Sequence, residues 1–163
     1  LKAGADLVND IWGFKWDDRM AEIVAKSGVA CCLMHNRHDT DYNNYLEDVV
    51  ADIRESIDIA LNAGVKEDKI VIDPGIGFVK DTRQNLILLN NLDKLVEMDY
   101  PVLLGTSNKS VIGNTLNLDV ENRLEGTLTT SILGFNKGCS FFRVHDVKAN
   151  KRALMMANAI INS

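Results

Sequence analysis

The 163-residue sequence lacks a surplus of basic residues: 18 Lys and Arg are outnumbered by 23 Asp and Glu, which leaves a net charge of −5. Nucleic acids and other polyanions favour basic proteins, so we expect no nucleic-acid partner, and an anionic ligand needs a local cluster of cations. The sequence also lacks an apolar run of about 18 residues, so no transmembrane helix and no membrane partner are expected. The N-terminal segment Leu1–Gly4 does not resemble a signal peptide.

Cysteine is scarce, with only Cys31, Cys32 and Cys139. An odd count without a CxxC pair excludes both a disulfide framework and a cysteine zinc site. Cys31 and Cys32 lie in an apolar run, which favours buried core thiols. Free thiols of this kind are typical of a cytoplasmic protein.

The sequence does contain a regular alternation of two patterns. Strand-like apolar runs occupy Ala5–Asn9, Val29–Met34, Lys69–Asp73, Pro101–Gly105 and Ser140–Val144. Helical periodicity follows them at Asp17–Ser27, Asn43–Ala63, Thr82–Met98, Val120–Asn136 and Lys148–Ile161. Short strands alternating with amphipathic helices predict a single α/β domain over residues 1–163, with a parallel sheet and helical crossovers.

Polar residues cluster directly after each predicted strand. These clusters are Asn9–Asp10, His35–Asn36, Asp73–Gly75, Gly105–Ser107 and Arg143–His145. Parallel α/β sheets bind ligands at the C-terminal ends of their strands, where the loops that lead into the helices converge. The pattern therefore predicts an active-site face.

The number of units points to a barrel that is not closed. A (β/α)8 TIM barrel needs eight strand–helix units, and the sequence holds about five. Leu1–Gly4 resembles the tail of a helix with its terminating glycine. An open arc of strands leaves two edges unpaired. We therefore expect the five C-terminal units of an incomplete barrel, or partner chains that supply the missing wall.

The segment Asp73–Phe78 combines a carboxylate, a proline and two glycines after an apolar strand. Proline ends the strand ladder, and glycine lets the backbone turn sharply and approach a ligand closely. Asp73 has the strand parity of Val71, so its carboxylate is expected to point inward. A carboxylate there suits a ligand edge with paired N–H donors, such as a 2-aminopyrimidinone. The alternative is a helix-cap or turn aspartate.

Gly105–Ser110 leads from a strand into a short helix. Lys109 and Ser110 offer a cation, a hydroxyl and free backbone N–H groups, which suit an anion such as a carboxylate. The spacing is not that of a phosphate-binding Walker A loop. The alternative is a capped helix with a solvated lysine.

Arg143 and His145 end the last strand and are two positions apart, so their side chains share one face. An arginine and a histidine in a strand-end cleft are suited to a diphosphate or an oxyanion. The alternative is a salt bridge between Arg143 and a nearby carboxylate. On the other strands, Asn9 can hydrogen-bond a heterocycle and Met34 can form an apolar floor.

His35 and His38 form an H-x-x-H pair. Only one other histidine, His145, is present, so a zinc site has weak support. His35 is equally well explained as a core histidine with satisfied hydrogen bonds.

Taken in order, five segments resemble the motifs of dihydropteroate synthases. They are Asn9–Gly13, Met34–Asn36, Asp73–Phe78, Leu103–Ser110 and Arg143–Val147. The resemblance implies a (β/α)8 barrel that condenses 7,8-dihydropterin-6-ylmethyl diphosphate with p-aminobenzoate and releases diphosphate. It also implies that sulfonamides compete for the p-aminobenzoate site.

The resemblance assigns a role to each candidate residue. Asn9 and Asp73 would bind the pterin edge, with Ile11 and Met34 lining its pocket. Lys109 would reach the pterin ring, and Phe78 and Ser110 would contact p-aminobenzoate beside Gly105. Arg143 and His145 would hold the diphosphate, and with Lys109 they are the expected catalytic residues. The implied cofactor is Mg²⁺, bound with the substrate diphosphate in a complete enzyme by residues outside this chain.

The sequence departs from the family at three positions: Asn108 replaces a common arginine, and Val79 and Asp81 replace a common glycine and threonine. The family's first two catalytic loops have no counterpart, so we expect little or no synthase activity from the 163 residues alone. Family members commonly dimerise through C-terminal barrel helices, which implies a homodimer through the helices between Val120 and Ile161.

Two other functions compete with the synthase. A pterin-binding methyltransferase, which acts on methyltetrahydrofolate and a corrinoid protein, shares the barrel and the grip on the pterin. Lys109–Ser110 and Arg143–His145 favour the synthase, because they suit an aryl amine acceptor and a diphosphate leaving group. The other alternative is a non-catalytic pterin-binding module, which should form a discrete oligomer.

Overall fold

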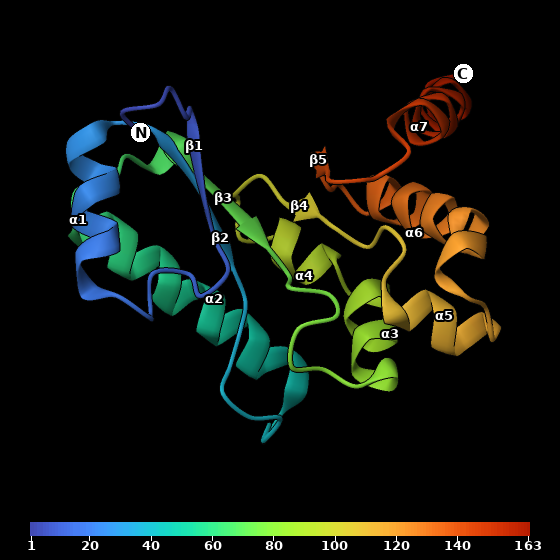
Figure 1. Cartoon of the computed structure of the whole chain (residues 1–163), viewed down its shortest axis with the longest axis horizontal. Coiled ribbons are helices and arrows are strands. Elements are labelled where there is room, and N and C mark those ends of the chain that lie inside the picture. Colours follow the sequence, from blue (N-terminus) through green and yellow to red (C-terminus); the bar gives the residue numbers. More distant parts are fainter.

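A computed structural model describes residues 1–163 as alternating strands and helices (Figure 1). The strands are β1 (Leu7–Asp10), β2 (Ala30–Met34), β3 (Ile70–Asp73), β4 (Leu103–Leu104) and β5 (Phe141–Phe142). The α-helices are α1 (Asp18–Ser27), α2 (Tyr45–Asn62), α3 (Thr82–Asn90), α4 (Asp93–Val96), α5 (Ser110–Leu116), α6 (Leu124–Asn136) and α7 (Val147–Ile161). Two 3₁₀ turns, η1 and η2, cover Glu67–Lys69 and Val120–Asn122. A helix able to span a membrane is absent from the chain.

All five strands run parallel and neighbour one another in sequence order. β1 pairs with β2, β2 with β3, and β4 with β5. A parallel bridge between Ile72 and Val102 joins the two groups, and the Ile72 N–H donates to the carbonyl of Pro101 at 3.0 Å. The predicted α/β class with a parallel sheet is therefore confirmed.

Local signals set the helix boundaries. Asp17 accepts a hydrogen bond from the Arg19 N–H at 2.9 Å and begins α1, which ends at Gly28 in the left-handed conformation. Asp81 begins α3 with a capping box, in which Gln84 bonds back to the Asp81 N–H at 2.9 Å. Asp81 thus has a structural role at the position where the family often has threonine.

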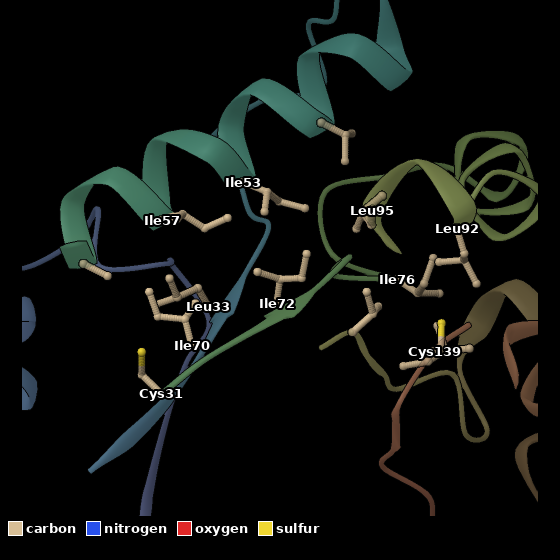
Figure 2. Packing of buried hydrophobic residues seen from close by; sticks show 14 of the residues in the cluster. Cys31, Leu33, Ile53, Ile57, Ile70, Ile72, Ile76, Leu92, Leu95 and Cys139 are labelled. Atoms are coloured by element: carbon tan, nitrogen blue, oxygen red, sulfur yellow. The ribbon is translucent and has the colours of Figure 1, made fainter. Parts of the chain in front are cut away.

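One face of the sheet is packed against helices. Leu33, Ile70 and Ile72 are at most 1% exposed and lie opposite Ile53 and Ile57 of α2 (Figure 2). Because side chains alternate along a strand, the residues next to these in the sequence point to the opposite face of the sheet. Cys31 and Cys32 are both buried on successive positions of β2, as predicted for core thiols.

The opposite face carries the predicted ligand residues. Asn9 is the register partner of Cys32, and Met34 is the partner of Asp73. The side chains of register partners point to the same side, so the predicted inward parity of Asp73 agrees with the strand pairing. We call this side of the sheet the concave face, and the helix-packed side the outer face.

Several predicted boundaries were wrong. The helix predicted over Thr82–Met98 is interrupted after Asn90, where the Asn91 side chain donates to the Ile87 carbonyl at 2.8 Å and the chain re-forms a short helix, α4. The periodicity of this segment places Leu86 on one apolar stripe with Leu92 and Leu95. Leu92 and Leu95 are fully buried, but Leu86 is 44% exposed and Leu88 is buried in its place. A 3₁₀ turn precedes α6, so the helix predicted from Val120 begins at Leu124. The strands predicted over Pro101–Gly105 and Ser140–Val144 are shorter in the structure, where β4 and β5 have two residues each.

Candidate functional site

Arg143 connects three strands on the concave face. Its Nη1 donates to Asn9 Oδ1 and its Nη2 to Asp73 Oδ2, each at 3.0 Å. Asp73 is 1% exposed, and its other oxygen accepts the Gly75 N–H at 2.8 Å. Both simpler alternatives, a salt bridge for Arg143 and a turn aspartate for Asp73, are therefore present. The hydrogen bonds to Asn9 and Asp73 use only some of the N–H groups of Arg143, whose side chain is 45% exposed, and the others are free.

Gly105 makes room for this arginine. A Cβ atom at position 105 would lie 2.8 Å from Arg143 Nη2, closer than a side chain can approach. Met34 is buried beside Asp73 on the concave face and can form the predicted apolar floor. Ile11 lies beyond the end of β1 and is 43% exposed, so it is open to a ligand.

Lys109 packs against the loop after β3. Its Nζ donates to the carbonyl of Ile76 and lies 4.8 Å from the ring centroid of Phe78, a cation–π contact. Burial lowers the pKa of Lys109, although the charge of Asp73 opposes this shift. Lys109 is therefore held at the loop rather than free in solvent. Ser110, the first residue of α5, is exposed.

His145 is held by Ser107, whereas Arg143 is held by Asn9 and Asp73. Its Nδ1 lies 2.8 Å from Ser107 Oγ, and its backbone N–H donates to the same oxygen at 3.1 Å. Ser107 is buried, so it fixes the exposed His145 at the end of β4. The two predicted diphosphate ligands thus come from one strand end but have separate supports.

A buried network lies behind the loop after β3, and its lysine, Lys80, was not among the residues predicted from the sequence. His35 contacts Asp52 Oδ2 through Nε2 and Lys80 Nζ through Nδ1, each at 2.9 Å. The interpretation of His35 as a satisfied core histidine is confirmed. His38, its partner in the H-x-x-H pair, instead contacts Trp12 with the two rings tilted and their centroids 4.6 Å apart. The signal available in the sequence was a lysine three residues after Gly77, the second glycine of the turn.

Burial sets the charge of this network. It lowers the pKa of His35 to about 4, so the ring is neutral near pH 7 and its contact with Asp52 is a hydrogen bond between a neutral ring and a carboxylate. Burial also lowers the pKa of Lys80 to about 7. Burial alone would raise the pKa of Asp52, but hydrogen bonds from His35 and Arg37 outweigh it and lower that pKa.

Two of the departures from the family lie in left-handed backbone. Asn108 has φ 56°, and asparagine adopts this region more readily than most side chains, including arginine. Its N–H donates to Thr127 Oγ1 at 3.1 Å, and its carbonyl accepts from Arg123 Nη1 at 2.8 Å. Val79 has φ 43°, a strained conformation for a β-branched residue.

The residues at this face do not form a metal site by themselves. The chain contains no group of three His, Cys, Asp or Glu side chains placed to hold an ion. Asn9 Oδ1 and Asp73 Oδ2 are oxygens of the kind that bind Mg²⁺, but both accept hydrogen bonds from the guanidinium of Arg143.

Comparison with known proteins adds to this geometry. The curated dihydropteroate synthases of Clostridium beijerinckii and Bacillus subtilis are 54% and 48% identical to the chain over 162 residues. A Clostridium difficile dihydropteroate synthase, solved in the presence of pteroic acid, superposes with a TM-score of 0.96 at 44% identity, covering 99% of this chain and 62% of that one. A Coxiella burnetii dihydropteroate synthase in complex with pteroic acid gives a TM-score of 0.92 at 38% identity, covering 98% of this chain and 62% of that one.

The two curated relatives match 99% of this chain, which spans 60% and 57% of their lengths, or about three fifths. A family model, described as pterin binding enzyme, matches residues 1–145 and so includes every candidate residue. With this match, and with the parallel strands that bring Asn9, Asp73 and Arg143 together, the chain belongs to the pterin binding enzyme family.

Proposed function

We propose that the chain supplies pterin, p-aminobenzoate and diphosphate contacts of a dihydropteroate synthase. The observation that carries the proposal is the set formed by Asn9, Asp73 and Arg143, three side chains from three strands that meet on the concave face. The names of the similar proteins support it. The reaction would join 7,8-dihydropterin-6-ylmethyl diphosphate to p-aminobenzoate and release diphosphate.

The pterin would bind through its polar edge. Asp73 offers a buried carboxylate and Asn9 an amide, which together can accept from and donate to a 2-aminopyrimidinone. Met34 would lie under the ring and Ile11 beside it. Lys109 lies close to Phe78 and would approach the pterin from the p-aminobenzoate side.

The aryl amine would bind between the two loops that Lys109 connects. Phe78 offers an aromatic face, and Ser110 offers an exposed hydroxyl at the start of α5, the helix that follows the Gly105 loop. Holding the amine nitrogen in line with the pterin methylene carbon accelerates bond formation, because the two reactants no longer have to find each other.

The diphosphate would leave toward Arg143 and His145. The bond between the methylene carbon and the diphosphate oxygen breaks as the carbon–nitrogen bond forms, so negative charge grows on the leaving group. The amine nitrogen then loses one proton, to the departing diphosphate or to water. The free N–H groups of Arg143 can stabilise that charge. No side-chain nucleophile is required, and Cys31, Cys32 and Cys139 are all buried.

Magnesium stays a prediction for the complete enzyme. The residues of the concave face do not fit the ion on their own, since Arg143 occupies the oxygens of Asn9 and Asp73. No step in this proposal passes through the metal.

We also propose that the five parallel strands form part of a (β/α)8 barrel. The coverage of the relatives supports this, because about two fifths of their length has no counterpart here. The 163 residues alone should then show little or no synthase activity.

A homodimer through the C-terminal helices belongs to the same proposal. Exposed apolar side chains are concentrated on α6 and α7, including Leu133, Met155, Met156 and Ile160, which are 54–63% exposed. Sedimentation equilibrium tests the assembly: a dimer weakened by Met156→Asp supports it, and a monomer at all concentrations contradicts it.

Isothermal titration with a 6-hydroxymethylpterin diphosphate analogue tests the site. Asp73→Asn and Arg143→Ala should each weaken binding at least about tenfold, or about 1.4 kcal/mol. The exposed Asp58→Asn and Arg83→Ala are matched controls and should bind as the unchanged chain does.

A chain that binds only after the missing strands are added would keep the family function and assign the site to the whole barrel. Failure of the completed barrel to bind would refute the synthase.

A further inference from the structure

The amine of Lys80 lies within the turn that joins β3 to α3. Its Nζ donates to the carbonyls of Gly75 and Phe78, each at 3.0 Å, and lies 2.9 Å from Nδ1 of His35. The ammonium form of Lys80, which predominates below its lowered pKa of about 7, has three hydrogens and no acceptor, so these three contacts use all of its donors. One side chain thus joins both ends of the turn to the end of β2.

The hydrogen bonds extend beyond Lys80 to His35, Asp52 and Arg37. Because Lys80 donates to Nδ1, the hydrogen of the neutral His35 ring is on Nε2, which donates to Asp52 Oδ2 at 2.9 Å. Arg37 donates to the same carboxylate, with Nη2 3.2 Å from Oδ1. The Lys80 network, meaning Lys80, His35, Asp52 and Arg37, therefore converges on the Asp52 carboxylate in the N-terminal half of α2, with Lys80 and His35 donating from the turn and Arg37 from the other side.

The turn needs such support because its backbone is strained. Val79, between Phe78 and Lys80, has φ 43°, and a non-glycine residue in this region costs about 1–3 kcal/mol unless its surroundings hold it. Asn85 holds the same turn from α3, where its Oδ1 accepts the Gly77 N–H at 2.7 Å.

Two lysines hold this turn at different backbone carbonyls. Lys109 contacts the Ile76 carbonyl and the Phe78 ring on the side of the proposed ligand site. Lys80 reaches the Gly75 and Phe78 carbonyls from the side of β2 and α2. Phe78 is the residue that both lysines contact.

We propose that Lys80 is a positioning residue, which fixes the turn Pro74–Val79 through the Lys80 network and so places Phe78 for the aryl amine. The placement of Phe78 for a ligand rests on the proposed synthase function; the fixing of the turn does not. Asp73 belongs to β3 and is also held by Arg143, so it depends less on Lys80. The aryl-amine side should therefore lose more than the pterin side when Lys80 is changed.

The first test needs no substitution. Nitrogen-15 NMR of the imidazole should show His35 as the Nε2–H tautomer and neutral between pH 5 and 6.5, where Lys80 is an ammonium. A ring protonated on Nδ1, or one that titrates near 6.5, would overturn the network, because Lys80 could not then donate to Nδ1.

The second test is hydrogen exchange in Lys80→Met, with the exposed Lys94→Met as the matched control. The N–H groups of Gly77 and Phe78 should exchange at least about tenfold faster in Lys80→Met, while those of Ile53 and Ile57 in α2 stay protected. Unchanged exchange in the turn, or an equal rise throughout the chain, would show that Lys80 does not position it. If Lys80→Met fails to fold, the tautomer of the unchanged chain decides.

The ligand arm compares two titrations. Lys80→Met should weaken binding of a p-aminobenzoate analogue, in the presence of a pterin, by about tenfold and binding of the pterin alone by less than about threefold. Equal losses for both ligands would contradict the placement of Phe78. Absence of binding by the unchanged barrel would refute the synthase and leave the exchange result standing.

Discussion

The two faces of the parallel sheet differ in how far their side chains are exposed to solvent. On the outer face Leu33, Ile70 and Ile72 are at most 1% exposed and lie under α2. On the concave face the central residues are as well buried, but Leu7 of β1 is 41% exposed and Phe141 of β5 is 50% exposed. The apolar surface of the concave face is therefore open at both ends of the arc.

The outer face stabilises the fold, and the concave face positions the charged side chains. Burial of apolar side chains on the outer face contributes most of the free energy of folding, in proportion to the area removed from water. The concave face instead positions charges, with Arg143 joined to Asn9 and Asp73 across three strands. Substitutions on the two faces should therefore differ in the property that they change.

The largest expected effect is on the outer side. Ile53→Ala removes a side chain that is 1% exposed and should lower the free energy of unfolding by about 3 kcal/mol, because a cavity adds to the lost burial. Phe141→Ala, at the open end of the concave face, should cost about 1 kcal/mol or less even though it removes more atoms. Urea unfolding of both variants measures the difference. Equal losses would mean that Phe141 is covered in solution.

Acid should lower the free energy of unfolding through the Lys80 network, because the apolar side chains of the outer face do not titrate. The pKa of His35 falls from 6.5 to about 4 on folding, so the unfolded chain takes up a proton first as the pH drops. Stability should therefore be lost between about pH 6.5 and pH 4, by about 3 kcal/mol from this group. The lowered pKa of Asp52 extends the loss to pH values below 3.8.

Urea unfolding at pH 7 and pH 4.5 measures this loss, with His35→Gln as the variant and the exposed His38→Gln as its control. The difference between the two pH values should shrink in His35→Gln and persist in His38→Gln. The same difference in both would place the acid-sensitive group elsewhere.

The sequence predicted the parts of the site that depend on strand parity. Asp73 and Arg143 could be assigned to one face because side chains alternate along a strand and parallel strands end at one edge. The same logic could not reveal Lys80, since its partners His35 and Asp52 come from β2 and α2 and share no local pattern with it. Nor could periodicity choose between Leu86 and Leu88, because leucine-rich helices offer two adjacent stripes and only packing selects one.

Strain is the last property in which the regions differ, and it gives the smallest expected effect. Five non-glycine residues have positive φ, and Val79 is the β-branched one among them. Val79→Gly should raise the free energy of unfolding by about 1 kcal/mol, because relief of roughly 1–3 kcal/mol of strain exceeds the entropy cost of glycine, about 0.5–1 kcal/mol.

Asn117→Gly is the matched control, since Asn117 ends α5 in the left-handed region that asparagine tolerates. It should change stability by less than about 0.5 kcal/mol. A loss of stability in Val79→Gly would mean that the valine side chain contributes packing worth more than its strain. In that case the turn would be held by its own side chains and not only by the hydrogen bonds of Lys80 and Asn85.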